Sequence, residues 1–522
     1  MDIVAAWTGL LDSTADDLLT EVSVNESGQV SPSIYETARL VSTARWLDGH
    51  QERLLYLLEQ QRQDGSWGGP DGYALVPTLS VVEAFLVELS TGNRLRDRIH
   101  ISLARGISWL RRKPGSIPDT IAAELIVPWL VEEINQHLDH RLNTPSQFNR
   151  IAPHRLREAA RKGSTLPAKL WHSLEVLGAD AALVPVRPVN GTVGGSAAAT
   201  AAWLSGREGA GPDARSAIRH LDALQQRGGG PVPGVSPISV FERAWVVSAL
   251  ADGSIAIPTG LVESLHGALG EHGASAGAGL PTDSDDTAGV LYALAKAGRP
   301  ASPASLWEYE STDHFQCFPG ERTPSTSTNA HIMDALLLDT TEPPARRRAA
   351  LTRIAAWLCG QQTPEGCWWD KWHASPYYAT VCCALALHRT GGRRSAVGAA
   401  IRWVLDNQRP DGSWGRWTGT VEETAYAVQT LLATARTPTS PVVAEAAARG
   451  CAFLVRADRA EPANPPLWHD KDLYTPAAVV SAARLAALRM FARHPEAAAH
   501  RHRFPPCPRP RRAGTAVGRA TR

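Results

Sequence analysis

Apolar residues recur at helical spacing along most of the chain. The clearest segment starts after Thr420, where four apolar positions share one helical face: Val421, Ala425, Val428 and Leu432. Similar segments rich in Ala and Leu alternate with turns rich in Gly and Pro, and strand patterns are scarce. The pattern therefore predicts an all-α protein.

The pattern Q-x-x-x-G-x-W follows a predicted helix three times, at residues 61–67, 362–368 and 408–414. The glycine permits a tight or left-handed turn at the helix end. The tryptophan can then cover the neighbouring helix, while the glutamine side chain bonds free backbone groups. We interpret all three copies as structural staples between stacked helical hairpins, which predicts a toroid or solenoid of helices.

Composition and charge exclude several classes of protein. The chain has 522 residues, enough for two or more domains, and its net charge of +1 gives no reason to expect nucleic acid as a partner. We find no apolar run near the roughly 18 residues of a membrane span, and no basic segment typical of a secretion signal. Seven cysteines without a C-x-x-C pair argue against a disulfide framework or a zinc ribbon. We therefore expect a cytoplasmic protein without a transmembrane segment.

Tryptophan is unusually frequent, with 17 residues against 8 Phe and 9 Tyr. Either the core is built with large aromatic side chains, or a site uses the faces of their rings. A glycine-rich stretch at 270–281 is typical of a junction between two halves, and the Arg-rich segment 501–522 is typical of a disordered tail.

Three carboxylates stand within four residues, at Asp283, Asp285 and Asp286, and an apolar helical run follows them. Capping and the helix dipole explain one or two acids at a helix start. Three packed together cannot all ionise comfortably, so at least one stays protonated, as general-acid chemistry requires. Hard oxygen ligands for Mg²⁺ are the other interpretation. The spacing alone leaves both open.

The D-x-D-D-T-A segment and the Q-x-x-x-G-x-W repeats together resemble class II terpene cyclases, which protonate an alkene. Over nearly its whole length the chain resembles the bacterial class II diterpene cyclases, which act on geranylgeranyl diphosphate. Further blocks carry the likeness: 31–38, 326–331, 369–378, 422–426 and 465–474.

The resemblance implies two α-helical (α/α) barrel domains, called γ and β, with the cavity between them. It assigns an N-terminal helix to the β domain. The expected division is 1–30 for that helix, 31–275 for the γ domain, 276–500 for the β domain and 501–522 for the tail.

The resemblance also implies roles within the acid cluster, as we call Asp283, Asp285 and Asp286. Asp285 is the expected proton donor, and the other two orient and polarise it. Asn329 is the first candidate for a hydrogen-bond partner of the cluster, and His331 is the second.

A carbocation needs a lining that is electron-rich but not nucleophilic, and an aromatic face supplies about 0.5–2 kcal/mol per contact. The candidates for this lining are Trp245, Trp307, Trp369, Trp372, Tyr377 and Tyr378. Cationic side chains and Mg²⁺ suit the diphosphate. Lys371 has the strongest claim, from its family block; Arg161, Lys162 and Lys471 are weaker candidates. We expect Mg²⁺ as cofactor and assign it no protein ligand.

The Mg²⁺-binding motifs by which other terpene synthases ionise the diphosphate are incomplete here. The segment that begins Asp16-Asp17 lacks the last acid of both motifs, because Thr20 and Val24 stand there. The diphosphate should therefore stay intact and pass to a class I diterpene synthase.

The block Trp171-His172-Ser-Leu-Glu175 resembles a block found in copalyl diphosphate synthases. In the plant enzymes this histidine works with an asparagine, but Gly234 stands at that position here. His172 either positions a terminating water or is a buried structural histidine.

The expected function is an isomerase that forms a bicyclic labdane diphosphate of the copalyl type. A rearranged halimane or clerodane product, such as terpentedienyl diphosphate, is the alternative. A squalene-type triterpene cyclase would be longer and would carry a membrane-inserting segment. A protein prenyltransferase β subunit would need zinc ligands that the sequence does not offer. A non-catalytic scaffold leaves the acid cluster unexplained.

Overall fold

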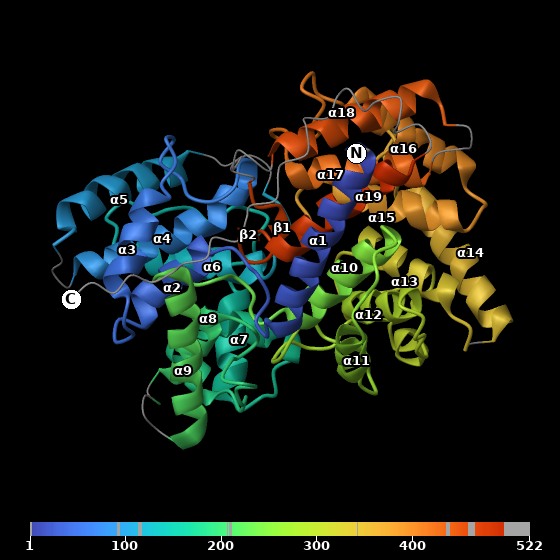
Figure 1. Ribbon diagram of the computed structural model, residues 1–522. Helices are drawn as coiled ribbons and strands as arrows, with labels where there is room; N and C mark the ends of the chain where they lie inside the picture. Colours follow the sequence, from blue (N-terminus) through green and yellow to red (C-terminus); the bar gives the residue numbers. More distant parts are fainter. Residues whose placement is uncertain are drawn as a thin grey trace, which may run out of the picture.

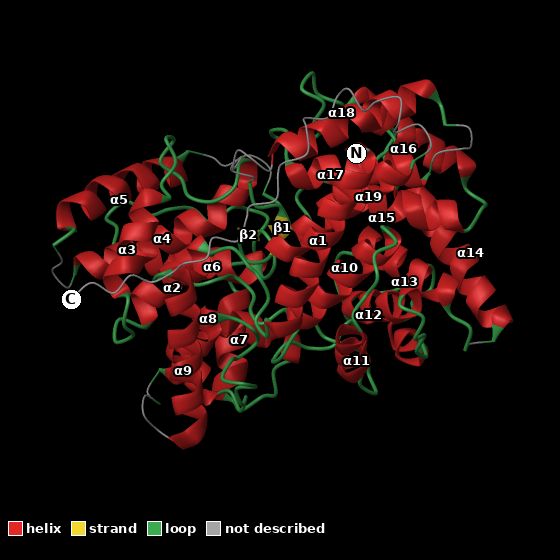
Figure 2. Ribbon diagram, in the orientation of Figure 1, coloured by secondary structure: helices red, strands yellow, loops and turns green. Residues whose placement is uncertain are grey.

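The computed structural model describes residues 3–90, 94–112, 117–205, 207, 211–341, 343–434, 439–457 and 465–494. The predicted tail, 501–522, lies outside them. Almost all regular structure in the described residues is helical, as Figure 2 shows, and one short hairpin of two strands lies between two helical lobes. The all-α prediction is confirmed.

The first lobe is a ring of helices on the left of Figure 1. Its ring consists of α2 (Ile34–Thr43), α4 (Leu75–Leu89), α6 (Ala123–Asn135), the 3₁₀ segment η2 (Ala168–Leu183) and α8 (Ala197–Leu204). Each packs on the next, and α8 closes the ring against α2. The remaining helices are η1 (Asp71–Ala74), α3 (His50–Glu59), α5 (Arg96–Arg111), α7 (Ala152–Arg161) and α9 (Gly211–Gly228).

The second lobe contains a ring of six helices, which we call the inner ring. It consists of α10 (Ser239–Asp252), α12 (Ser284–Lys296), α13 (Thr326–Leu338), α15 (Pro376–Arg389), α17 (Val421–Ala433) and α19 (Ala477–Arg493). Each packs on the next, and α19 closes the ring against α10. Around it lie α1 (Ile3–Val24), α11 (Thr259–Ala268), η3 (Ala304–Tyr309), α14 (Pro344–Gln361), α16 (Arg394–Asp406) and α18 (Pro441–Ala457). Two closed rings of helices match the expected α/α barrels.

The expected boundary between the lobes at residue 275 is wrong, whereas the N-terminal helix is placed correctly. Helix α1 packs on α19 and α10, so it belongs to the second lobe. Helices α10 and α11 precede residue 275, yet both pack on α12 in that same lobe. The glycine-rich stretch is a close contact within the lobe, because a Cβ on Gly277 would lie 2.1 Å from the carbonyl oxygen of Pro237.

The three Q-x-x-x-G-x-W copies form the same local structure, as predicted. The tryptophans Trp67, Trp368 and Trp414 are fully buried. Each indole N–H donates to the backbone carbonyl ten residues earlier, over 2.6–2.7 Å. Each glycine has a φ between 91° and 106°, which a residue with a Cβ rarely adopts. Each glutamine amide bridges that glycine to the next helix.

Replacing Trp414 with Ala should therefore destabilise the second lobe strongly. We expect the free energy of unfolding to fall by about 3–5 kcal/mol, because a large cavity opens and a buried carbonyl loses its donor. Urea unfolding followed by circular dichroism measures this. Trp46→Ala is the control, since Trp46 is 42% exposed, and equal losses in both variants would contradict the staple role.

One segment of the described chain, Asp71–Leu89, is long and apolar enough to cross a membrane. The sequence analysis missed it. However, 83% of its apolar window is buried inside the protein, and Glu83 within it pairs with the buried Arg39. Such burial is typical of a core helix, and α4 indeed belongs to the ring of the first lobe.

Candidate active site

The acid cluster opens helix α12 of the inner ring. Asp283 is the N-cap, and its Oδ1 accepts the backbone N–H of Asp286 over 2.8 Å. Asp283 therefore caps the helix, and the carboxyl group of Asp285, in the first turn, is not needed for capping. Ser284 donates to the carbonyl of Gln316, which fixes the cluster against the loop before α13.

Burial and mutual repulsion keep protons on this cluster. Burial raises the pKa of Asp283 to about 7, and the nearby charge of Asp285 adds to the rise. The pKa of Asp286 is raised well above its usual value, first by burial and then by Asp283. Asp285 differs because 16% of its side chain remains exposed, so it is the member that a substrate can reach.

His331 on α13 is the direct partner of Asp285, with 2.7 Å between Nδ1 and Oδ1. Burial by itself lowers the pKa of His331, but the charge of Asp285 outweighs it, and the net pKa is raised well above the usual value. The imidazole is therefore held protonated and donates to the carboxyl group. This geometry stabilises the conjugate base of Asp285.

The prediction that Asn329 is the partner of the cluster is wrong. Its amide oxygen accepts from the backbone N–H of Phe315, and its amide nitrogen donates to the carbonyls of Phe315 and Ser325. These bonds fix the loop before α13. The helical turn directs His331, the second candidate, toward α12 instead.

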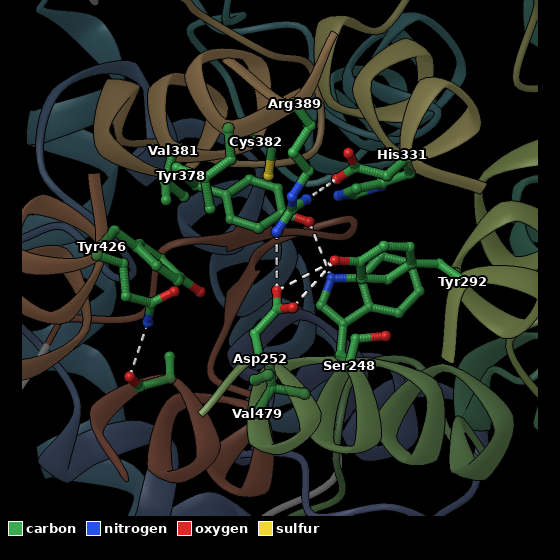
Figure 3. A pocket seen from close by; sticks show the side chains of 17 residues that line it. Ser248, Asp252, Tyr292, His331, Tyr378, Val381, Cys382, Arg389, Tyr426 and Val479 are labelled. Atoms are coloured by element: carbon green, nitrogen blue, oxygen red, sulfur yellow. Dashed lines mark hydrogen bonds and ion pairs between the residues drawn. The ribbon is translucent and has the colours of Figure 1, made fainter. Parts of the chain in front are cut away.

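A cavity of about 120 Å³ lies inside the inner ring on the other side of His331. Figure 3 shows His331, Tyr378 and Cys382 on its wall, and Asp252 and Arg389 joined by an ion pair. Arg389 also pairs with Asp334. His331 therefore stands between Asp285 and a cavity with charged groups on its wall.

Aromatic rings gather beside His331, the partner of Asp285, and two of the predicted ones are among them. Trp245 and Tyr378 lie 5.1 and 6.2 Å from the His331 ring, and the Trp245 indole donates to the Tyr378 hydroxyl. Phe241 and Trp468 extend this group, 4.4 Å from Trp245 and 4.6 Å from Tyr378. The sequence analysis missed both, although Phe241 lies one helical turn before Trp245 and Trp468 stands in a quoted block.

Three other aromatic candidates do not join this group. Trp369 is 47% exposed and lies against Arg416, in a second hollow of about 730 Å³. Tyr377 packs on Trp403, 4.7 Å away, in the wall of the barrel. Trp307 lies under the guanidinium of Arg346. Their predicted contact with a carbocation finds no support in this geometry.

Lys371 and Trp372 lie next to each other in the loop before α15. The Lys371 ammonium lies 4.9 Å from the Trp372 ring, pairs with Glu321 and donates to the carbonyl of Thr323. The Trp372 indole N–H is buried and makes no hydrogen bond within the described chain. A diphosphate at Lys371 would therefore compete with Glu321.

The weaker diphosphate candidates have other partners. Lys471 is fully buried, and its ammonium bonds Glu36, Glu175 and Ser196 of the first lobe. Arg161 and Lys162 are 64% and 67% exposed on the surface of that lobe. Lys471 is thus part of the contact between the lobes, and its prediction as a diphosphate ligand is wrong.

His172 is also buried between the lobes. Its Nδ1 lies 2.6 Å from the carbonyl oxygen of Gly194, and its Nε2 lies 2.7 Å from Oδ1 of Asp470. Asp470 sits at the tip of the hairpin formed by β1 (Trp468–His469) and β2 (Leu473–Tyr474). The sequence analysis did not single out Asp470, because its contact with His172 spans 298 positions.

A closed inner ring, an acid cluster at a helix start and an aromatic lining define a class II terpene cyclase. Comparison with known proteins agrees: the squalene-hopene cyclase C-terminal domain matches residues 322–477. An ent-copalyl diphosphate synthase of Streptomyces sp. (strain KO-3988) is 47% identical, over 93% of this chain and 97% of that protein. A copalyl diphosphate synthase of Streptomyces cyslabdanicus is 41% identical, over 92% and 96%.

A solved structure of ent-copalyl diphosphate synthase from Streptomyces platensis superposes with a TM-score of 0.86. It is 46% identical and covers 92% of this chain and 99% of its own. This chain therefore belongs to the bacterial class II diterpene cyclases, an isomerase family.

Proposed function

We propose that the protein cyclises geranylgeranyl diphosphate to a bicyclic diphosphate of the copalyl type and leaves the diphosphate attached. The observation that carries this proposal is the pair of Asp285 and His331 at the mouth of the inner ring, with aromatic rings beside it. Two relatives that share more than 40% identity over most of the chain bear copalyl names, which favours the unrearranged skeleton.

Asp285 is the proposed proton donor to the terminal alkene. An alkene is a very weak base, so the donor must be strong and its conjugate base must be stabilised. The His331 imidazolium bonds Oδ1, which leaves Oδ2 to carry the acidic proton. The raised pKa values of Asp283 and Asp286 reduce the negative charge that these neighbours place beside that acid.

The cavity behind His331 offers Asp285 a way to regain its proton. His331 lines this cavity, and so do Asp252, Asp334 and Arg389. A proton that enters past these charged groups reaches His331 first and Asp285 next. His331 would therefore relay the proton from this cavity to Asp285.

The raised pKa of His331 sets the expected pH dependence. The charged form, with its support of Asp285, is fully present below the ordinary histidine pKa of about 6.5 and is lost as the pH rises through the raised value. We expect the wild-type kcat to hold through neutral pH and to fall on the alkaline side. His331→Asn should lower kcat by about 10²-fold and remove this alkaline limb.

Measuring kcat between about pH 6 and 10 for both proteins tests this expectation. His272→Asn, at a side chain 65% exposed, is the matched control and should keep the wild-type profile. An unchanged profile in His331→Asn would contradict the assigned role.

The product is identified by incubating the purified protein with geranylgeranyl diphosphate and Mg²⁺. After dephosphorylation, mass spectrometry and NMR distinguish the copalyl skeleton from halimane or clerodane alternatives, and chiral chromatography gives the enantiomer. Recovery of geranylgeraniol alone would contradict the proposal. Squalene, offered separately, should remain unchanged.

Magnesium remains a proposal. Among the described residues no group of three or more His, Cys, Asp or Glu side chains is arranged to hold a metal ion. Mg²⁺ does not require such a group, because it is commonly bound by one or two carboxylates together with substrate phosphates, and we expect the diphosphate oxygens to supply most of its ligands. Lys371 is the proposed cation for that end of the substrate.

We further propose that the cyclic diphosphate passes to a class I diterpene synthase and that both steps occur in the cytoplasm. The retained diphosphate supports the first idea, because it is the leaving group that a second synthase would ionise. The cysteines in the described chain are all free, which suits a reducing compartment.

A further inference from the structure

The hairpin tip places three charged residues in a row between the lobes: Asp470, Lys471 and Asp472, each at most 5% exposed. Lys471 is fully used by its partners in the first lobe. Asp472 accepts from the Ser33 hydroxyl through one oxygen and from the Tyr35 backbone N–H through the other. Asp470 differs, because Oδ1 faces His172 while Oδ2 is buried and makes no hydrogen bond within the described residues.

The contacts of His172 exclude it as the proton acceptor. The Gly194 carbonyl can only accept, so Nδ1, which lies 2.6 Å away, must carry a hydrogen. Burial lowers the pKa of His172, but the charge of Asp470 outweighs it and the net pKa is raised. Both ring nitrogens therefore donate, and the imidazolium has no lone pair to offer. The basic atom that remains in this pair is Oδ2 of Asp470.

The backbone at Gly234 lies against that oxygen. A Cβ on Gly234 would lie 2.9 Å from Oδ2, so any larger residue there would press on the carboxylate.

Tyr474 connects this oxygen to the start of the reaction. Burial raises the pKa of the Tyr474 phenol, and the charges of Asp470 and Asp286 raise it further. Tyr474 also pairs with Trp468 across the hairpin, and Trp468 lies 4.6 Å from Tyr378 in the aromatic group beside His331. The hairpin that carries Asp470 therefore reaches the aromatic group beside the partner of the proton donor.

Building on the proposed function, we propose that Asp470 is the base that ends ring closure. Oδ2 takes a proton from a carbon next to the final cation; the C–H bond breaks, its electron pair forms the new C=C bond, and Asp470 becomes neutral. His172 is a positioning residue that holds Oδ1. Asp285 gives one proton and Asp470 takes one, so the reaction is an isomerisation without net proton change.

The basicity of Asp470 suffices for this step. Burial raises its pKa, but the charge of His172, together with the ammonium and backbone N–H of Lys471, brings the net value below the usual range. The carboxylate is therefore ionised at neutral pH. A carbocation is so strong an acid that even a weak base removes its proton.

Asp470→Asn tests the inference, with Asp472→Asn as the matched control in the same hairpin. In the Asp470→Asn variant the amide oxygen can still accept from His172, but the group that replaces Oδ2 is no longer basic. We expect turnover to fall about tenfold or more and the products to shift to diphosphates that have captured water or rearranged. Asp472→Asn should still form the wild-type product, even if the substitution lowers the stability of the protein.

Product identity separates the outcomes. If Asp470→Asn gives only the wild-type product, or loses yield as Asp472→Asn does without any new product, Asp470 is structural and the inference fails. His172→Gln keeps a donor toward Oδ1 and should keep the wild-type product as the main one. If His172→Gln instead forms only new products while Asp470→Asn forms none, His172 is the base. Failure of the wild type to form any cyclic diphosphate would instead overturn the proposed function.

Discussion

Replacing Asp285 with Asn should lower kcat by about 10³-fold or more, while the substrate still binds. The amide has nearly the shape of the carboxyl group but carries no acidic proton. Because Asp283, and not Asp285, caps α12, the substitution should leave the helix start intact. The expected loss therefore comes from chemistry and not from unfolding.

Steady-state turnover of geranylgeranyl diphosphate, with circular dichroism as a check of folding, measures this effect. Asp313→Asn is the control, because Asp313 is 63% exposed and lies beside His314 away from the cluster. If the Asp285→Asn protein keeps more than a tenth of the wild-type kcat, Asp285 is not the proton donor.

Replacing Lys471 with Met should lower the free energy of unfolding by about 3–5 kcal/mol. The substitution leaves Glu36 and Glu175 buried without their cation. Burial lowers the pKa of Lys471, but these two carboxylates outweigh it and raise the net pKa, so the lysine is charged when it pairs with them. Since both glutamates belong to the first lobe, the loss should also loosen the contact between lobes.

Urea unfolding of Lys471→Met against Lys162→Met measures this effect. Lys162 forms an exposed pair with Glu158, so its replacement should leave the free energy of unfolding nearly unchanged. Adding Glu36→Gln and Glu175→Gln to Lys471→Met should recover part of the loss, because the uncompensated charges disappear. A Lys471→Met protein within about 1 kcal/mol of the wild type would contradict the account.

The sequence predicted the helices and their stacking because both depend on local patterns. Apolar spacing indicated the helices, and three copies of one short motif indicated the staples at Trp67, Trp368 and Trp414. The boundary at residue 275 was wrong because glycine has two uses in sequence. Glycine can make a linker flexible, or it can let two backbone segments approach closely, as Gly277 does beside Pro237.

The acid cluster was predictable for the same local reason, since all three carboxylates belong to one turn. Its partner was not, because packing within the inner ring decides whether Asn329 or His331 faces α12. Asp470 and Lys471 were harder still. Their partners lie hundreds of positions away in the other lobe, and nothing in the sequence marks a surface-type charge as buried.

The central claim, that Asp285 starts the reaction by protonating an alkene, is tested most directly in deuterium oxide. Asp285 should exchange with the solvent through His331, so each cyclic diphosphate formed should carry a single deuterium at the ring carbon that the acid protonates. Mass spectrometry and NMR of the dephosphorylated product locate that label. A cyclic product without deuterium, or release of diphosphate in step with turnover, would contradict initiation by protonation.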